Sequence, residues 1–205
     1  MPSDELRIRI QRIYEAVDEV VETDISKFMP KVIKDDKRIG FYQDWSGGRS
    51  EAEVENIAHI LIYNVANLKD HLRKWADNNG KDKSKANAAF RASQALKIIK
   101  DLSNNDRHGY DRAKKGNSGK SPRIDKINTI MRMTTKPEKG SFVSLTFDRQ
   151  GVPKITGSGN AKVIITGDIL DRDGNKIGDL YDTLLEAINV WERVLSEFDV
   201  KIRSD

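Results

Sequence analysis

The sequence predicts a mainly α (α+β) fold, a helical bundle with a C-terminal β-hairpin or meander inserted before the last helix. Three observations support this. Apolar residues recur with helical spacing through the first half of the chain, the period changes to two after Gly140, and a helical stripe returns near the C-terminus. Because a helix that follows a sheet must bury its apolar stripe, we expect the last helix to pack on the first ones. All 205 residues are therefore expected to form a single domain, 1–205.

Four helices are expected, over residues 3–29, 50–79, 84–104 and 179–199. Ser3, followed by two acidic residues, is a suitable start for the first helix. Ser50 and Glu53 form a capping box that opens the second, and Gly80 ends it. Between these helices, residues 30–49 are expected to form a loop whose aromatic side chains pack over a helix end.

The apolar stripes of these helices predict a common core. Small residues in the third helix allow a neighbour to approach closely, and the last helix carries a clean apolar stripe. We expect these stripes to cover one another, with the following residues buried together: Leu61, Leu68, Ile99, Leu184, Ile188 and Trp191.

The β insert is expected over residues 140–178. Alternating apolar residues predict a strand over 142–147, and a second strand starts at Val163. Asp173-Gly174-Asn175 then predicts the turn of a hairpin.

Composition excludes several classes of protein. The chain has no cysteine, which removes disulfide frameworks, thiolate metal sites and thiol nucleophiles. No apolar run approaches the roughly 20 residues that span a bilayer, so we expect no membrane partner. The charged, periodic start is unlike a signal peptide, and we expect a cytoplasmic protein.

Three apparent motifs do not carry a site. The phrase at 116–121 resembles a phosphate-binding loop, but Lys114 stands where its first glycine belongs, and we expect a flexible loop. The phrase at 171–174 places Ile169 and Leu180 at calcium-ligand positions, so it is expected to be a hairpin turn. His59 and His71 lack metal-ligand spacing. No metal and no cofactor are expected.

Polar groups gather at the end of the third expected helix, in the phrase Asp101-Leu102-Ser103-Asn104-Asn105-Asp106-Arg107-His108. An imidazole beside a guanidinium can move a proton near a phosphodiester, which makes Asp101, Arg107 and His108 the candidate catalytic residues. The alternative is that basic residues and amides at this position only terminate a helix.

The phrase DLSNNDRHG, the order of elements and the closing hairpin with LYDTLLEAINVWERVL resemble the HEPN superfamily of small bacterial proteins. The resemblance implies contact with RNA or an RNA-bearing partner, a homodimer, and a place in bacterial stress or phage defence. Catalytic members carry an Arg shortly before the motif His. Here the corresponding positions hold Asp101, Leu102 and Ser103, so only His108, with Arg107 adjacent, carries over.

A basic segment follows. Residues 112–126 hold six bases against one acid, a net charge of +5, whereas residues 179–199 hold six acids against one base. The bases could lie along a phosphate backbone, and the candidate nucleic-acid-binding residues are Arg112, Lys114, Lys115, Lys120 and Arg123. The alternative is a solvated loop, or one that docks on the acidic last helix.

The leading interpretation is a HEPN-like protein that contacts RNA or an RNA-bearing partner as a homodimer. The alternative is a non-catalytic protein–protein interaction module, or a subunit of a toxin–antitoxin or defence complex. If the chain is an enzyme, we expect a metal-independent ribonuclease.

Overall fold

The computed structural model describes residues 4–110 and 116–200. The helices are α1 (Asp4–Val20), α2 (Glu51–Asn78), α3 (Ser84–Ala92), α4 (Gln94–His108) and α5 (Leu180–Glu197), with a short 3-10 helix, η1 (Ile25–Lys27). The strands are β1 (Val21–Glu22), β2 (Lys31–Lys34), β3 (Ile39–Tyr42), β4 (Arg123–Thr134), β5 (Val143–Phe147), β6 (Pro153–Gly157), β7 (Asn160–Leu170) and β8 (Lys176–Asp179).

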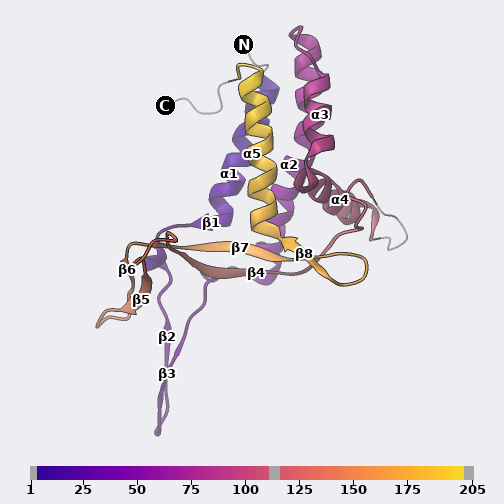
Figure 1. Cartoon of the computed structure of the whole chain (residues 1–205). Helices are drawn as coiled ribbons and strands as arrows, with labels where there is room; N and C mark the ends of the chain where they lie inside the picture. Colours follow the sequence, from indigo (N-terminus) through magenta and orange to yellow (C-terminus); the bar gives the residue numbers. More distant parts are fainter. Residues whose placement is uncertain (1–3, 111–115, 201–205) are drawn as a thin grey trace.

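Strand β7 is the centre of the main sheet. It pairs antiparallel with β1, β4 and β8, while β2–β3 and β5–β6 form separate two-stranded hairpins. Figure 1 shows α1, α2 and α5 rising from one side of the β4–β7 pair, with both hairpins on the other side. The molecule is therefore a helical layer standing on a small sheet.

The predicted architecture, a helical bundle with a hairpin insert at 140–178, is wrong. The main sheet takes β1 from the N-terminal region and β4 from residues before the predicted insert, of which only 123–126 belong to the predicted basic segment, so it is a layer and not an insert. Two features explain why the sequence does not reveal β4: a register irregularity between Ile124 and Ile127, and residues 129–132, which are partly buried on both faces of the strand. A bulge adds a residue to one strand and so breaks the two-residue alternation that reveals a strand in sequence.

Two helix boundaries also differ from the expectation. The first helix ends at Val20 and not near 29, because Val21 and Glu22 pair with Ile164 and Val163 of β7. The helix expected at 84–104 is two helices, broken at Ser93 with φ −93° and ψ 120°. The Ser93 hydroxyl accepts a hydrogen bond from the Leu96 amide at 3.2 Å and so caps the start of α4. The expected cap Ser3 lies outside the described residues.

The predicted core is confirmed. The six residues expected to be buried together belong to one cluster, which also includes Ile164 and Ile169 of the sheet. Trp191 is 2% exposed, and its indole Nε1 donates to the carbonyl oxygen of Val65 at 3.1 Å. The capping box of Ser50 and Glu53 is also confirmed at the start of α2.

Residues 30–49 are not the loop that we expected. Lys31–Lys34 pairs with Ile39–Tyr42 in an antiparallel hairpin, and Figure 1 shows this hairpin extending away from the helices. Trp45, just past the hairpin, packs on Phe28 with ring centres 5.7 Å apart, close to the sheet and not over a helix end. We call the hairpin of residues 31–42 the arm.

Candidate functional site

Asp101 lies buried on α4 and binds the loop that follows the helix. Its carboxylate accepts hydrogen bonds from the Asn117 amide at 2.8 Å, the Asn117 side chain at 2.6 Å and the Ser118 amide at 2.7 Å. A Cβ at Gly116 would lie 2.5 Å from an Asp101 oxygen, so this close approach requires glycine. The Asp101 carboxylate, which was expected to be catalytic, is therefore hydrogen-bonded to the loop.

Two further contacts fix the same loop along α4. The Asn105 side chain donates to the Pro122 carbonyl at 2.9 Å, and the Tyr110 hydroxyl donates to the Ser121 carbonyl at 3.3 Å. The loop over 116–122 was expected to be flexible. In the structure its backbone is instead tied to α4 by Asp101 and Asn105, and to Tyr110 just past the helix.

Arg107 and His108 face other surroundings. The Arg107 guanidinium lies over the ring of Tyr63 on α2, 4.2 Å from its centre, in a cation–π contact. His108 is the last residue of α4 and is exposed. The structure therefore does not bring Asp101, Arg107 and His108 together into one site, because Asp101 faces the loop and Arg107 faces α2.

Sequence reasoning missed a second polar contact between the same helices. His59 Nδ1 on α2 lies 3.4 Å from Asp106 Oδ1 on α4. The pair borders a recess of about 250 Å³ whose rim also includes Glu55, Tyr110 and Asp125. A carboxylate beside Nδ1 can orient an imidazole, but His59 and Asp106 lie on separate helices, and no spacing in the sequence relates them.

The structure describes only two of the five candidate RNA-binding residues. Lys120 and Arg123 are exposed on either side of the buried Ser121 and Pro122. Arg112, Lys114 and Lys115 lie outside the described residues.

Several of the acidic groups of α5 and its ends pair with bases outside the 112–126 segment. Asp182 pairs with Arg132, Glu197 with Lys85, and Asp199, just past the helix, with Lys81.

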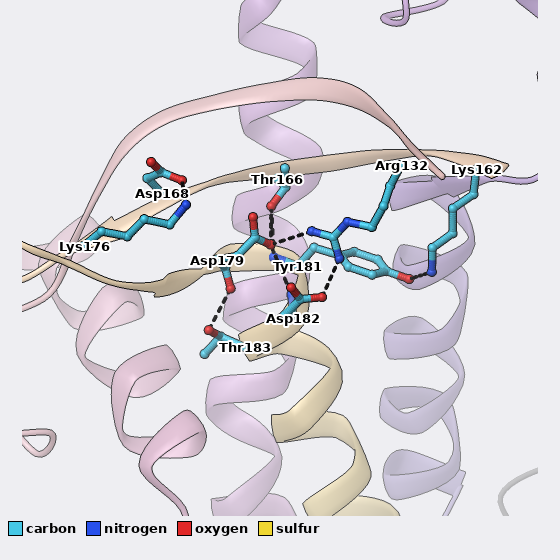
Figure 2. A network of polar contacts seen from close by, with 9 residues as sticks. All are labelled: Arg132, Lys162, Thr166, Asp168, Lys176, Asp179, Tyr181, Asp182 and Thr183. Carbon is cyan, nitrogen blue, oxygen red and sulfur yellow. Dashed lines mark hydrogen bonds and ion pairs between the residues drawn. The ribbon is translucent and has the colours of Figure 1, made fainter. Parts of the chain in front are cut away.

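A polar network joins the start of α5 to the sheet (Figure 2). The Asp179 carboxylate accepts from the Thr166 hydroxyl at 2.6 Å and lies 3.3 Å from the Arg132 guanidinium. The guanidinium also contacts Asp182 at 2.5 Å. Lys162 donates to the Tyr181 hydroxyl at 2.7 Å. Every group in the network has a partner from the chain itself, which indicates a structural role.

The arm exposes large apolar side chains. Val32 is 59% exposed, Ile33 61% and Tyr42 56%. In the hairpin register Lys31 lies opposite Tyr42 and Ile33 opposite Gly40, so Ile33 and Tyr42 share one face while Val32 lies on the other. Both faces of the arm thus present apolar groups to solvent.

Comparisons with protein-family models, curated proteins and solved structures found no match. The HEPN resemblance thus stays a prediction. Among the described residues, no cluster of His, Asp and Glu side chains could hold a metal ion, and no helix is long and apolar enough to cross a membrane.

Proposed function

We propose that this chain is a non-catalytic protein-interaction module and that the arm is the surface that engages its protein partner. The observation that carries the proposal is the exposure of Val32, Ile33 and Tyr42 on a hairpin that extends away from the body (Figure 1).

The physical argument concerns stability. A two-stranded hairpin is at best marginally stable alone in water, because it buries little apolar surface. Contiguous apolar groups on a protruding element are typical of a surface that a partner covers. Each strand of the arm also has one edge whose backbone groups can pair with another chain. Lys31 and Lys34 on β2 limit unspecific edge pairing, which favours a selected partner over aggregation.

The placement of the expected catalytic groups supports a non-catalytic role. Asp101 is enclosed by the 116–118 loop, and Arg107 stacks on Tyr63. Neither group is free to act together with His108 on one substrate. Their contacts instead stabilise the packing of α4 against the loop and α2.

The test uses assemblies recovered from the chain's own host cells. Size-exclusion chromatography with light scattering should find the parent chain in an assembly larger than one chain. The double change Ile33→Asp and Tyr42→Asp should release the chain, because two buried charges would be left without partners. Phe147→Asp, at an exposed apolar residue of β5, is the matched control and should stay assembled.

Treatment with ribonuclease should leave the assembly intact. A parent chain recovered as a monomer would overturn the proposal, and so would an arm variant that stays assembled. An assembly that ribonuclease dissolves would instead favour contact with RNA.

RNA contact is the second candidate function, favoured by the exposed Lys120 in the loop that Asp101 holds in place and by the exposed Arg123, the first residue of β4. Changing both to Ala should weaken RNA binding and lower its salt dependence by about one unit of slope for each lost phosphate contact. Lys154→Ala, at an exposed residue of β6, is the control. Equal RNA affinity of parent and double variant would remove this candidate.

A further inference from the structure

We propose that the partner of the arm is a second copy of this chain, and that the arm lies in the groove between α1 and α2 of that copy. This inference rests on the proposed function of the arm and adds its partner and its binding site.

The groove is a shallow surface hollow of about 580 Å³, lined by Arg12, Glu15, Ala16, Glu19, Ile60 and Asn64. Ile60 is 55% exposed, although it lies near the middle of α2. Ile8 precedes Arg12 by one turn of α1, so it extends the same face, and it is 47% exposed. Ile60 in the groove and Ile8 one turn beyond it on α1 thus offer two exposed apolar side chains.

The arm and the groove match in length. From Ile8 to Glu19 the groove face of α1 runs about 17 Å at 1.5 Å per residue. The four residues of β2 run about 13 Å, and the turn at 35–38 adds to this length. An arm of this size can place Ile33 and Tyr42 against Ile60 and Ile8.

The charges of the arm and of the groove are complementary as well. Residues 31–38 of the arm hold four bases and two acids, whereas the exposed side of α1 near the groove holds three acids, Glu15, Asp18 and Glu19, and one base, Arg12. Arg38 already pairs with Asp35, and Glu19 pairs with Arg49. Lys34, Lys37 and Glu15 have no ion pair with any described residue, and these are the charges that the contact would join.

The arm cannot occupy the groove of its own chain. It extends from the side of the sheet opposite to α1 and α2 (Figure 1). The groove must therefore belong to another copy, and a two-fold axis lets each copy give one arm and accept one. Such a closed exchange limits the assembly to a dimer.

The first test uses the absence of cysteine from the chain, which makes introduced thiols the only ones present. Purified Ile33→Cys and Ile60→Cys variants are mixed in equal amounts under mild oxidation. A disulfide between the two variants is expected. Ile33→Cys mixed with Phe147→Cys is the control and should not cross-link. A disulfide between two Ile33→Cys chains would overturn the proposal, because it indicates arm-to-arm pairing.

The second test is complementation, followed by light scattering of the purified chain. Ile33→Asp damages the arm and Ile60→Asp damages the groove, and each variant alone should be a monomer. Both side chains are exposed, so both variants should still fold, with the circular-dichroism spectrum of the parent. Their mixture should form a heterodimer, because one intact arm still meets one intact groove.

A mixture that stays monomeric, or a purified parent that is a monomer, would overturn this inference. The proposed function can hold even where this inference fails. If Ile33→Asp abolishes the assembly recovered from cells while Ile60→Asp leaves it intact, the arm has a different protein partner.

Discussion

Asp101 illustrates how a residue with catalytic chemistry can serve structure alone. The phrase from Asp101 to His108 gathers seven polar or charged side chains in about two helical turns, which is what a site would need. In the fold, α4 turns Asp101 inward to the loop at 116–118 and Arg107 outward to Tyr63. Sequence reasoning identified the cluster, but it could not assign directions, because these depend on contacts between residues far apart in the chain.

Replacing Asp101 by Asn should therefore destabilise the fold. The amide can accept fewer hydrogen bonds and loses the charge, so the free energy of unfolding should fall by about 2 kcal/mol. Asp106→Asn is the matched control, because Asp106 is exposed and its ion pair within the described residues is with His59 at 3.4 Å. Urea unfolding measures both. Equal stability of the Asp101 variant and the parent would contradict this role.

A second prediction about a single residue concerns His71 and the pH dependence of stability. Burial, and then the nearby positive charge of Arg9, lower the pKa of His71, and these effects outweigh Glu5 at 3.5 Å. The folded protein thus binds a proton at His71 less readily than the unfolded chain, whose pKa is about 6.5. The free energy of unfolding should therefore be unaffected by His71 above a pH of about 6.5. It should fall as the pH drops below that value, because the unfolded chain then binds a proton more readily.

The measurement is the loss of unfolding free energy between pH 7.5 and pH 5. It should be smaller in His71→Gln than in the parent, because the variant has no group to protonate there. If His71→Gln keeps the parent's full pH dependence, burial of this histidine does not contribute.

Helix starts were the elements that the sequence predicted best. Ser50 and Glu53 sit three residues apart, and that local spacing suffices to place the start of α2. The positions at which a helix or a strand is interrupted were predicted worst. Ser93 breaks a continuous apolar stripe, and the register irregularity at Ile124–Ile127 hides the start of β4. Both interruptions depend on what packs against the segment in the folded chain, which a local pattern does not reveal.

The start of α5 depends on Asp179, which accepts from the Asp182 amide at 3.3 Å and also binds Thr166 and Arg132. Asp179→Ala should cost about 2 kcal/mol, near the top of the range for an N-cap, because the sheet contacts are lost as well. Asp168→Ala is the control. It removes only an ion pair between exposed side chains with Lys176, and such pairs contribute little. A melting temperature equal in both variants would contradict the assignment.

At the scale of the whole molecule, the sequence predicted which residues are buried but not how the layers are arranged. Helical stripes are local patterns, so Leu61, Ile99 and Trp191 could be assigned to the core directly. The sheet joins strands from distant parts of the chain. Its outer strand β1 is two residues long and leaves no pattern to detect.

The arm was missed for a related reason. Lys31–Lys34 and Ile39–Tyr42 flank a polar turn, Asp35-Asp36-Lys37-Arg38, which is a signal for a hairpin. A hairpin that leaves Val32, Ile33 and Tyr42 exposed lacks the buried face that makes such a signal convincing. A partner would supply that face.

Amide hydrogen exchange of the arm tests this account most directly. In the assembly, the backbone amides of residues 31–42 should exchange slowly, because a partner covers the arm and excludes water. After dilution below the assembly's dissociation range, the same amides should exchange fast, while those of α2 and α5 stay protected by the core. Fast exchange of the arm at every concentration and in the assembly recovered from cells would contradict the claim that the arm is the interface.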